Sequence, residues 1–187
     1  CCCIRPYAMW KNDFRKQLLL NMDHVITPSI DRVIWCYGEY QDSMKHLPSK
    51  VELVDHLDLS NHNPSKTSLV IIDDMMCEIG NNKTVTQLFT KGTHHRNMSI
   101  ILILQNMFYK DKELRAISLN THYFFVFKNP RDSSQIINLA KQISPRNSKY
   151  VQSAYQQATS VPHGYLMLDF KQQTPEYLRL RTGLLPN

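Results

Sequence analysis

Two runs of this sequence are apolar on both of their faces, and they constrain the fold more than any other feature. They are Leu69–Ile72 (LVII) and Ser99–Leu104 (SIILIL). A half-buried strand alternates apolar and polar residues, whereas a continuous apolar run indicates a strand covered on both sides, as in parallel sheets. With the shorter β-branched and aromatic runs, the predicted strands are Arg32–Tyr37, Val51–Val54, Ser68–Asp74, Met98–Gln105, His122–Phe127, Tyr165–Phe170 and, after a turn, Tyr177–Arg181.

Helical patterns lie between these strands. Phe14, Leu18 and Met22 recur every four residues, and an apolar stripe that begins at Ile136 runs to Ile143. Strands that alternate with helices of this length predict a parallel α/β fold. An apolar fraction of 42% is that of an ordinary globular protein, and the chain has no linker long enough to divide it. We therefore predict a single domain over residues 1–187.

The charge of the chain is concentrated in its last third. The formal net charge is +6, from 22 basic and 16 acidic residues. Residues 128–187 contain eight of the basic and three of the acidic ones, a net charge of +5. A basic surface attracts polyanions such as DNA. The alternative is a solvated basic face without a partner.

The cysteines indicate a reduced, intracellular protein. They are Cys1–Cys3, Cys36 and Cys77, an odd number without a CxxC pair. A metal- or thiol-dependent enzyme built on Cys1–Cys3 with His94 and His95 is an alternative, although adjacent residues do not easily converge on one ion. No apolar run approaches 18 residues, so we expect no membrane partner. The chain starts without methionine, which suggests a fragment whose first strand is truncated.

Polar residues follow the two most apolar runs. Asp73 and Asp74 come directly after one of them, and Gln105 follows the other. Ligands of parallel α/β sheets bind at the carboxyl ends of strands, where a carboxylate pair can hold Mg²⁺ and orient water. Arg96, between the two runs, could reach the nucleotide of a neighbouring subunit. The alternatives are a turn or helix cap for the Asp pair, a strand-end cap for Gln105 and a surface arginine for Arg96.

Taken in order, several segments resemble one family. They are WCYGEYQ, LVIIDDMM, QLFTKGTHHRNMSIILILQN, ISLNTHYFFVFKNPRDSSQI and GYLMLDFKQQTPEYLRLRT. They are similar to the DNA-packaging ATPases of large eukaryotic DNA viruses (the poxvirus type), and above all to the versions carried by adintoviruses and Polinton/Maverick elements. These enzymes belong to the FtsK/HerA branch of P-loop NTPases. The resemblance extends from about Pro6 to Arg181.

The resemblance implies a three-layer, RecA-like P-loop NTPase fold and assigns roles to the polar residues. Asp73, in the Walker B segment 69–74, would hold Mg²⁺, and Asp74 would be the catalytic base, where the branch often has Glu. Gln105 matches the sensor at the end of the strand region 98–106. Arg96 matches the arginine finger, which acts between subunits of a ring.

The sequence departs from the family in the phosphate-binding loop, residues 5–12. The family motif has two glycines, whose places Arg5 and Trp10 take, and a Mg²⁺-binding Ser or Thr, whose place Asn12 takes. Lys11 keeps its position and would bind the β- and γ-phosphates of ATP. Glycine permits the backbone curl and the close approach to phosphate that such loops need. The chain could be an inactive copy, bind nucleotide weakly through Lys11, or carry a start that replaces a sound loop.

Two functions are implied by the resemblance. The first is an ATP- and Mg²⁺-dependent motor that forms a homo-oligomeric ring and moves double-stranded viral or transposon DNA into a capsid, with capsid proteins as further partners. The second is a catalytically inactive or truncated remnant that binds DNA or other subunits without hydrolysis. In either case we expect an intracellular location, in the host nucleus, a cytoplasmic assembly site or the virion.

Overall fold

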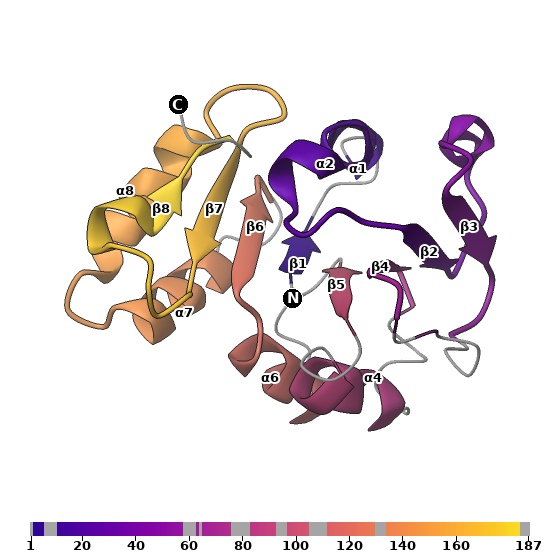
Figure 1. Ribbon diagram of the computed structural model, residues 1–187. Coiled ribbons are helices and arrows are strands. Elements are labelled where there is room, and N and C mark those ends of the chain that lie inside the picture. The colour runs from indigo at the N-terminus through magenta and orange to yellow at the C-terminus, as the bar shows by residue number, and fades with distance from the viewer. Residues whose placement is uncertain are drawn as a thin grey trace.

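The computed structural model describes residues 2–5, 11–57, 63, 65–75, 83–92, 97–104, 112–129 and 134–183 (Figure 1). For residues 2–5, 11–13, 15, 16, 43, 46, 83, 84, 91 and 92 it describes the backbone only. Among the described residues, eight strands form one sheet in the order β3-β2-β4-β5-β1-β6-β7-β8. None of the described helices combines the length and the hydropathy that crossing a membrane requires.

The elements follow the chain in an alternating order. The strands are β1 (Cys2–Arg5), β2 (Arg32–Tyr37), β3 (Val51–Val54), β4 (Ser68–Asp73), β5 (Met98–Ile103), β6 (Tyr123–Phe127), β7 (Tyr165–Asp169) and β8 (Leu180–Arg181). The α-helices are α1 (Lys11–Leu20), α2 (Met22–Val25), α4 (Lys83–Gln87), α6 (Lys112–Leu119), α7 (Ser134–Ile143) and α8 (Ser148–Ala158). The shorter helical turns are η1 (Asp42–His46), η2 (Leu88–Gly92) and η3 (Glu176–Leu178).

The sheet is parallel over most of its width. The pairs β3·β2, β2·β4, β4·β5, β5·β1 and β1·β6 are all parallel. The pairs β6·β7 and β7·β8 are antiparallel. The α/β class and the mostly parallel sheet predicted from the sequence are therefore confirmed.

One face of the sheet is covered by α1 and α2, and we call it the α1 face. Alternate residues of the central strands point to it, because successive side chains of a strand point to opposite sides. Its buried cluster includes Leu69, Ile71, Ile101 and Ile103 from β4 and β5, with Phe14, Leu18 and Met22 from the two helices. The predicted stripe Phe14–Leu18–Met22 is thus buried as one surface, although the chain bends at Asn21 and Met22 begins α2.

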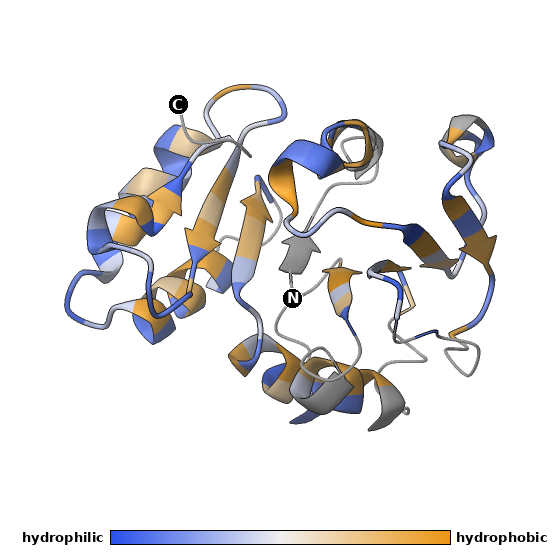
Figure 2. Ribbon diagram, viewed as in Figure 1, coloured by the Kyte–Doolittle hydropathy of each residue, from blue (hydrophilic) through white to orange (hydrophobic). Residues whose placement is uncertain are grey.

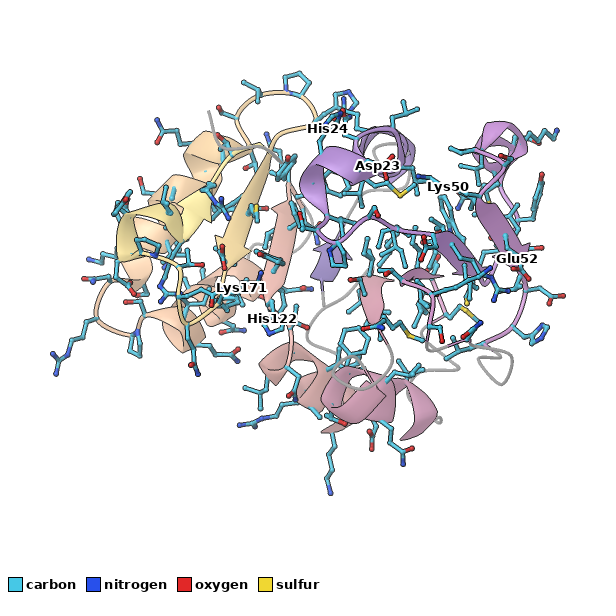
Figure 3. The ribbon with its side chains drawn as sticks, viewed as in Figure 1. Asp23, His24, Lys50, Glu52, His122 and Lys171 are labelled. Atoms are coloured by element: carbon cyan, nitrogen blue, oxygen red, sulfur yellow. The ribbon has the colours of Figure 1, made fainter. Side chains whose placement is uncertain are left out.

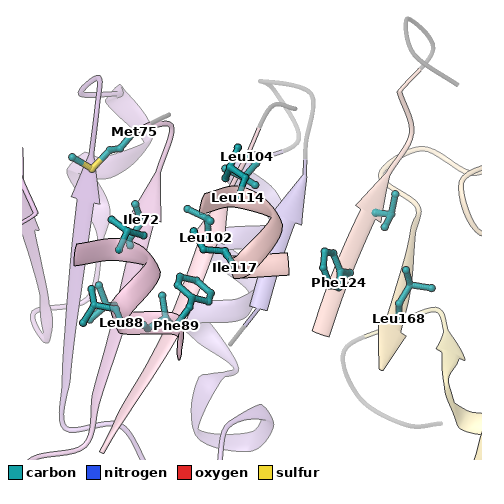
Figure 4. Close-up of a cluster of buried hydrophobic side chains, with 14 of the residues drawn as sticks. Ile72, Met75, Leu88, Phe89, Leu102, Leu104, Leu114, Ile117, Phe124 and Leu168 are labelled. Atoms are coloured by element: carbon teal, nitrogen blue, oxygen red, sulfur yellow. The ribbon is translucent and has the colours of Figure 1, made fainter. Parts of the chain in front are cut away.

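The opposite face, which we call the α6 face, is covered by α4, η2, α6, α7 and α8. Its cluster takes the other residues of the same strands, Val70, Ile72, Ile100 and Leu102, together with Phe89 of η2 and Leu114 and Ile117 of α6 (Figure 4). Figure 2 shows apolar residues along the strands and polar ones on the outer sides of the helices. Helices on both faces are compatible with the predicted three-layer arrangement.

Most strands lie where the sequence predicted them. β2 and β3 begin and end at the predicted residues, and β4 to β7 differ by one or two residues at their ends. The predicted last strand, Tyr177–Arg181, is shorter in the structure, where it covers only Leu180–Arg181. The chain first forms the turn η3, in which Tyr177 is 82% exposed, and only Leu180–Arg181 pair with β7. Arg179 ends η3 with a helical φ of −71° and ψ of −28°, and its side chain bonds Glu176 within the same turn (Nε to Oε1, 2.6 Å).

Aromatic packing attaches α1 to the sheet. The Phe14 ring lies 5.1 Å from that of Phe125, 5.3 Å from that of Phe127 and 5.3 Å from that of Tyr165. These centroid distances are in the range of favourable tilted and edge-to-face aromatic pairs. The first turn of α1 is therefore held against β6 and β7.

Replacing Phe14 with alanine should remove this attachment. We expect Phe14→Ala to lower the free energy of unfolding by about 3–5 kcal/mol, the usual cost of deleting a buried phenylalanine ring. Leu20→Ala on the same helix is the matched control, because Leu20 is 67% exposed, and should cost less than about 0.5 kcal/mol. Urea denaturation measures both values. Equal costs for the two variants would contradict this account of α1.

Tyr165 should make the protein less stable at high pH. Burial raises the pKa of Tyr165 to about 12, above the value of about 10 in an unfolded chain. Between these pH values the folded state binds the phenol proton more tightly, so the free energy of unfolding falls as pH rises. Urea denaturation at pH 9 and 11 should show a smaller fall in Tyr165→Phe than in the parent. Tyr177→Phe, at an exposed position, should behave as the parent does.

Candidate functional site

At the carboxyl edge of the sheet, the chain turns to opposite faces after the neighbouring strands β1 and β5. The chain leaves β1 for α1 on one face, whereas it leaves β5 for α6 on the opposite face. β1 and β5 are neighbours in the sheet. Connections that diverge from neighbouring strands open a crevice at their carboxyl ends, where ligands of open α/β sheets bind. The order of the strands therefore places the expected ligand site at the carboxyl ends of β1 and β5, and of β4 beside them.

Asp73 lies in a row of paired residues that crosses the carboxyl ends of β2, β4, β5 and β1. It pairs with Ile103 of β5, and Ile103 is also the partner of Ile4 in β1. Two strand spacings, about 10 Å, therefore separate Asp73 from the backbone of β1 near its end. On its other side Asp73 pairs with Tyr37. Tyr37 and Ile103 both pack in the cluster of the α1 face, so Asp73 also points to that face.

Asp73 is buried, and Asp74, which follows the end of β4, is only half-buried. The Asp73 residue is 2% exposed, whereas Asp74 is half-buried. A carboxylate at that depth stays ionised only with hydrogen bonds or positive charge close to it. Asp74 has a φ of 57°, a left-handed conformation that Asp adopts more readily than most residues. The chain thus turns sharply between the two carboxylates.

Backbone contacts to the neighbouring strands fix this turn. The Asp74 N–H donates to the Ile103 carbonyl at 3.4 Å, and the Gly38 N–H donates to the Asp73 carbonyl at 3.1 Å. A Cβ atom on Gly38 would stand 2.7 Å from the Asp74 carbonyl oxygen. Glycine is therefore required at position 38, because any larger residue would push the end of β4 away. This role of Gly38 was not predicted from the sequence.

The N-terminus of α1 opens onto the same edge. α1 begins at Lys11, and Phe14 in its first turn packs on Phe127, the last residue of β6. The free N–H groups and the dipole of a helix N-terminus favour anions. The structure describes the backbone of Lys11 and Asn12, and their side chains lie outside the description. The helix start and Asp73 thus share one edge and one face.

Two further predicted residues lie outside the described part of the chain. They are Gln105, which follows Leu104, and Arg96, which precedes Asn97. Asn97 itself stands at the amino end of β5, where its carbonyl accepts the N–H of Ser68. About 17 Å of strand separates this level from Asp73.

The end of β4 offers the ligand chemistry that Mg²⁺ takes. Mg²⁺ usually binds one or two carboxylates together with waters and substrate phosphate oxygens. Asp73 and Asp74 supply carboxylates of this kind. Among the described residues no group of three or more His, Cys, Asp or Glu is arranged to hold a metal. Of the residues in the thiol alternative, Cys2 and Cys3 lie in β1, while Cys1, His94 and His95 lie outside the description.

Two more features of the edge were not singled out from the sequence. The rings of Tyr37 and Tyr40 form an edge-to-face pair at 5.8 Å beside Asp73. On the other side of β1, the Tyr155 hydroxyl donates to the Phe127 carbonyl at 3.0 Å and accepts the Asn129 N–H at 3.1 Å. Tyr155 thus attaches α8 to the end of β6. Its spacing on an amphipathic helix marks it only as a face residue, so no sequence signal indicates this role.

Comparison with known proteins adds no relationship: no protein family, curated protein or solved structure matches the chain. Any function assigned to the chain therefore has to be supported by the geometry of the carboxyl edge.

Gly38→Ala should destabilise the protein through the end of β4. The added Cβ would meet the Asp74 carbonyl, and relief of that overlap should cost about 1–3 kcal/mol. Glu39→Ala is the control, because the neighbouring Glu39 is exposed. Urea denaturation of the two variants gives the comparison. A Gly38→Ala variant as stable as the parent would show that the turn after β4 is not fixed in this way.

Proposed function

We propose that the chain is a nucleoside-triphosphate-binding domain of the DNA-packaging ATPase type. The observation that carries the proposal is the row Asp73–Ile103–Ile4 across three adjacent strands. It supports a site in which a buried carboxylate faces the strand-to-helix connection of β1 from about 10 Å. That distance suits a triphosphate and a hydrated ion between the two.

In the proposed site, residues on both sides of the nucleotide have separate roles. The N-terminus of α1 and Lys11 would bind the β- and γ-phosphates, and Asp73 would hold Mg²⁺. When bound, Mg²⁺ would neutralise the phosphate oxygens. Asp74, beyond the sharp turn, orients the attacking water and accepts its proton. Gln105 contacts the γ-phosphate from the end of β5.

The proposal includes a ring of identical subunits. Because Asn97 lies at the opposite edge from Asp73, Arg96 serves the site of a neighbouring subunit, where it stabilises the charge on the γ-phosphate. Double-stranded DNA is the transported partner, and capsid proteins receive it. This is the part of the proposal that rests on the family resemblance.

A non-enzymatic remnant is the second candidate, and the loop residues favour it. Trp10 stands where the family has the second glycine, and an indole would crowd a phosphate that binds to backbone N–H groups. The replacement of the first glycine of the motif by Arg5 disturbs the backbone of the loop less. Arg5 continues strand β1 and pairs with Val126, and an extended position accepts any residue except proline without backbone strain.

Thermal unfolding with ATP and Mg²⁺ tests the nucleotide site. A ligand at about 100 times its Kd adds about 2.7 kcal/mol to the free energy of unfolding. For a chain of this size that corresponds to a rise of roughly 5–10 °C in Tm. We expect Asp73→Asn to abolish the rise and Asp42→Asn, at an exposed position, to keep it.

A loop-restored variant separates the two candidates. If the parent shows no rise but Arg5→Gly, Trp10→Gly and Asn12→Thr together restore it, the chain is a remnant with an intact Asp73 side. If the parent binds ATP, DNA-stimulated hydrolysis that Asp74→Asn eliminates supports the motor. No rise in either chain would overturn the nucleotide site itself.

A further inference from the structure

The helical hairpin α7–α8 carries positive charge without any negative charge. From Ser134 to Leu168 the sequence contains no aspartate and no glutamate. The same stretch contains three basic residues, Lys141, Arg146 and Lys149, and all three are exposed. None of them forms an ion pair with a described residue. Their charges are therefore available to a partner.

The three cations lie within one nine-residue segment around the turn between the helices. Lys141 is in the last turn of α7, Arg146 is in the connection, and Lys149 is in the first turn of α8. The connection is compact, because the Asn147 N–H donates to the Ser144 carbonyl at 3.2 Å. We call Lys141, Arg146 and Lys149 the hairpin cluster. Figure 1 shows α7 and α8 beside β7 and β8, on the outer side of the fold.

The acidic residues that come next in the chain are already paired. Asp169 is 4% exposed, and the Arg181 Nη2 donates to its Oδ2 at 2.9 Å. Glu176 pairs with Arg179 at 2.6 Å. Residues 134–183 thus hold six basic and two acidic side chains, a net charge of +4, and the excess lies on the hairpin cluster and Lys171. Residues 11–57, by contrast, hold six basic and seven acidic ones.

Lys171 extends the positive surface at the amino edge of the sheet. Its ammonium lies 5.1 Å from the centroid of the Tyr123 ring, at the start of β6 (Figure 3). The hairpin turn lies toward the same edge. The hydroxyl of Tyr155 reaches the carboxyl end of β6 from the last part of α8, so the start of α8 lies toward the opposite end. The surface is therefore remote from Asp73.

The uncharged side chains around the cluster also suit a phosphate backbone. Protein contacts to nucleic-acid phosphates and sugars come from Arg and Lys, from Ser, Asn, Gln and Tyr side chains, and from helix N-termini. The N-terminus of α8 is not capped by the side chain of Asn147. Exposed amide, hydroxyl and phenol side chains of this part of the hairpin are Asn138, Gln142, Asn147, Tyr150 and Ser153.

We propose that the hairpin cluster binds the phosphate backbone of double-stranded DNA. Among the described residues of the hairpin, Ser134–Ala158, there are cations and neutral donors and no carboxylate, so these residues do not repel a polyanion. The inference rests on the proposed function for the identity of the polyanion, but the nucleotide site is not needed for binding. The contact is independent of DNA sequence, since phosphates carry no sequence information.

The salt dependence of DNA affinity tests the proposal. The probe is a duplex of mixed sequence, titrated without nucleotide by fluorescence anisotropy from 50 to 200 mM salt. Each lost phosphate contact makes the slope of log K against log salt shallower by about 1. We expect Lys141→Gln, Arg146→Gln and Lys149→Gln together to make the slope shallower by about 3 and to weaken binding roughly tenfold or more at 0.1 M salt.

The matched control removes the same number of charges elsewhere. Lys45→Gln, Lys66→Gln and Lys112→Gln together change three exposed lysines outside the hairpin, and should leave the slope near that of the parent. An equal change in both triple variants would overturn the proposal, because attraction would then depend on net charge alone. So would no change in the cluster variant, or displacement of the duplex by polyglutamate at equal charge concentration, which would indicate an acidic protein partner.

The result is separable from the test of the nucleotide site. If the cluster variant loses DNA while ATP raises the Tm of neither the parent nor the loop-restored chain, the DNA surface stands and the motor proposal falls. If ATP raises Tm and the DNA slope is unchanged in the cluster variant, the nucleotide site stands and this surface falls.

Discussion

The burial of β4 on both of its faces is the constraint that shapes the rest of the structure. All six residues of Ser68–Asp73 are buried, so neither face of the central sheet can be left to water. The chain meets this requirement by sending the connection after β1 to one face and those after β4 and β5 to the other. In open α/β sheets, ligands bind where such connections diverge, which here is at the carboxyl ends of β1 and β5.

The burial of β4 also places a carboxylate at the carboxyl edge of the sheet. A parallel ladder aligns strand ends, so a carboxylate that ends β4 stands level with the ends of β5 and β1. Asp73 is the last paired residue of β4 and is buried. The chain then turns sharply at Asp74, whose φ is left-handed. Gly38 allows this because it brings the end of β2 against the turn without a side chain. One glycine at the carboxyl edge thus has a definite structural reason.

Features that depend on the composition of a single segment could be predicted from the sequence. Contacts that depend on which strands are neighbours in the sheet could not. β4 and β5 were found because their runs are apolar on both faces, and Asp73 because it ends such a run. The strand order is not sequential, so the contact of Gly38 with Asp74 and the bond from Tyr155 to Phe127 had no local signal. The turn η3 was missed because Tyr177 reads as a strand residue, whereas its ring lies in solvent.

The proposed nucleotide and DNA surfaces lie at opposite edges of one sheet, and α8 spans the distance between them. Lys149 belongs to its first turn, whereas Tyr155, two turns later, is bonded to the carboxyl end of β6. β6 is the neighbour of β1, with Val126 opposite Arg5 at the start of the proposed phosphate-binding loop. A shift of α8 on DNA would therefore displace the strand beside that loop. Such a route carries coupling only if α8 has two positions that both ligands distinguish.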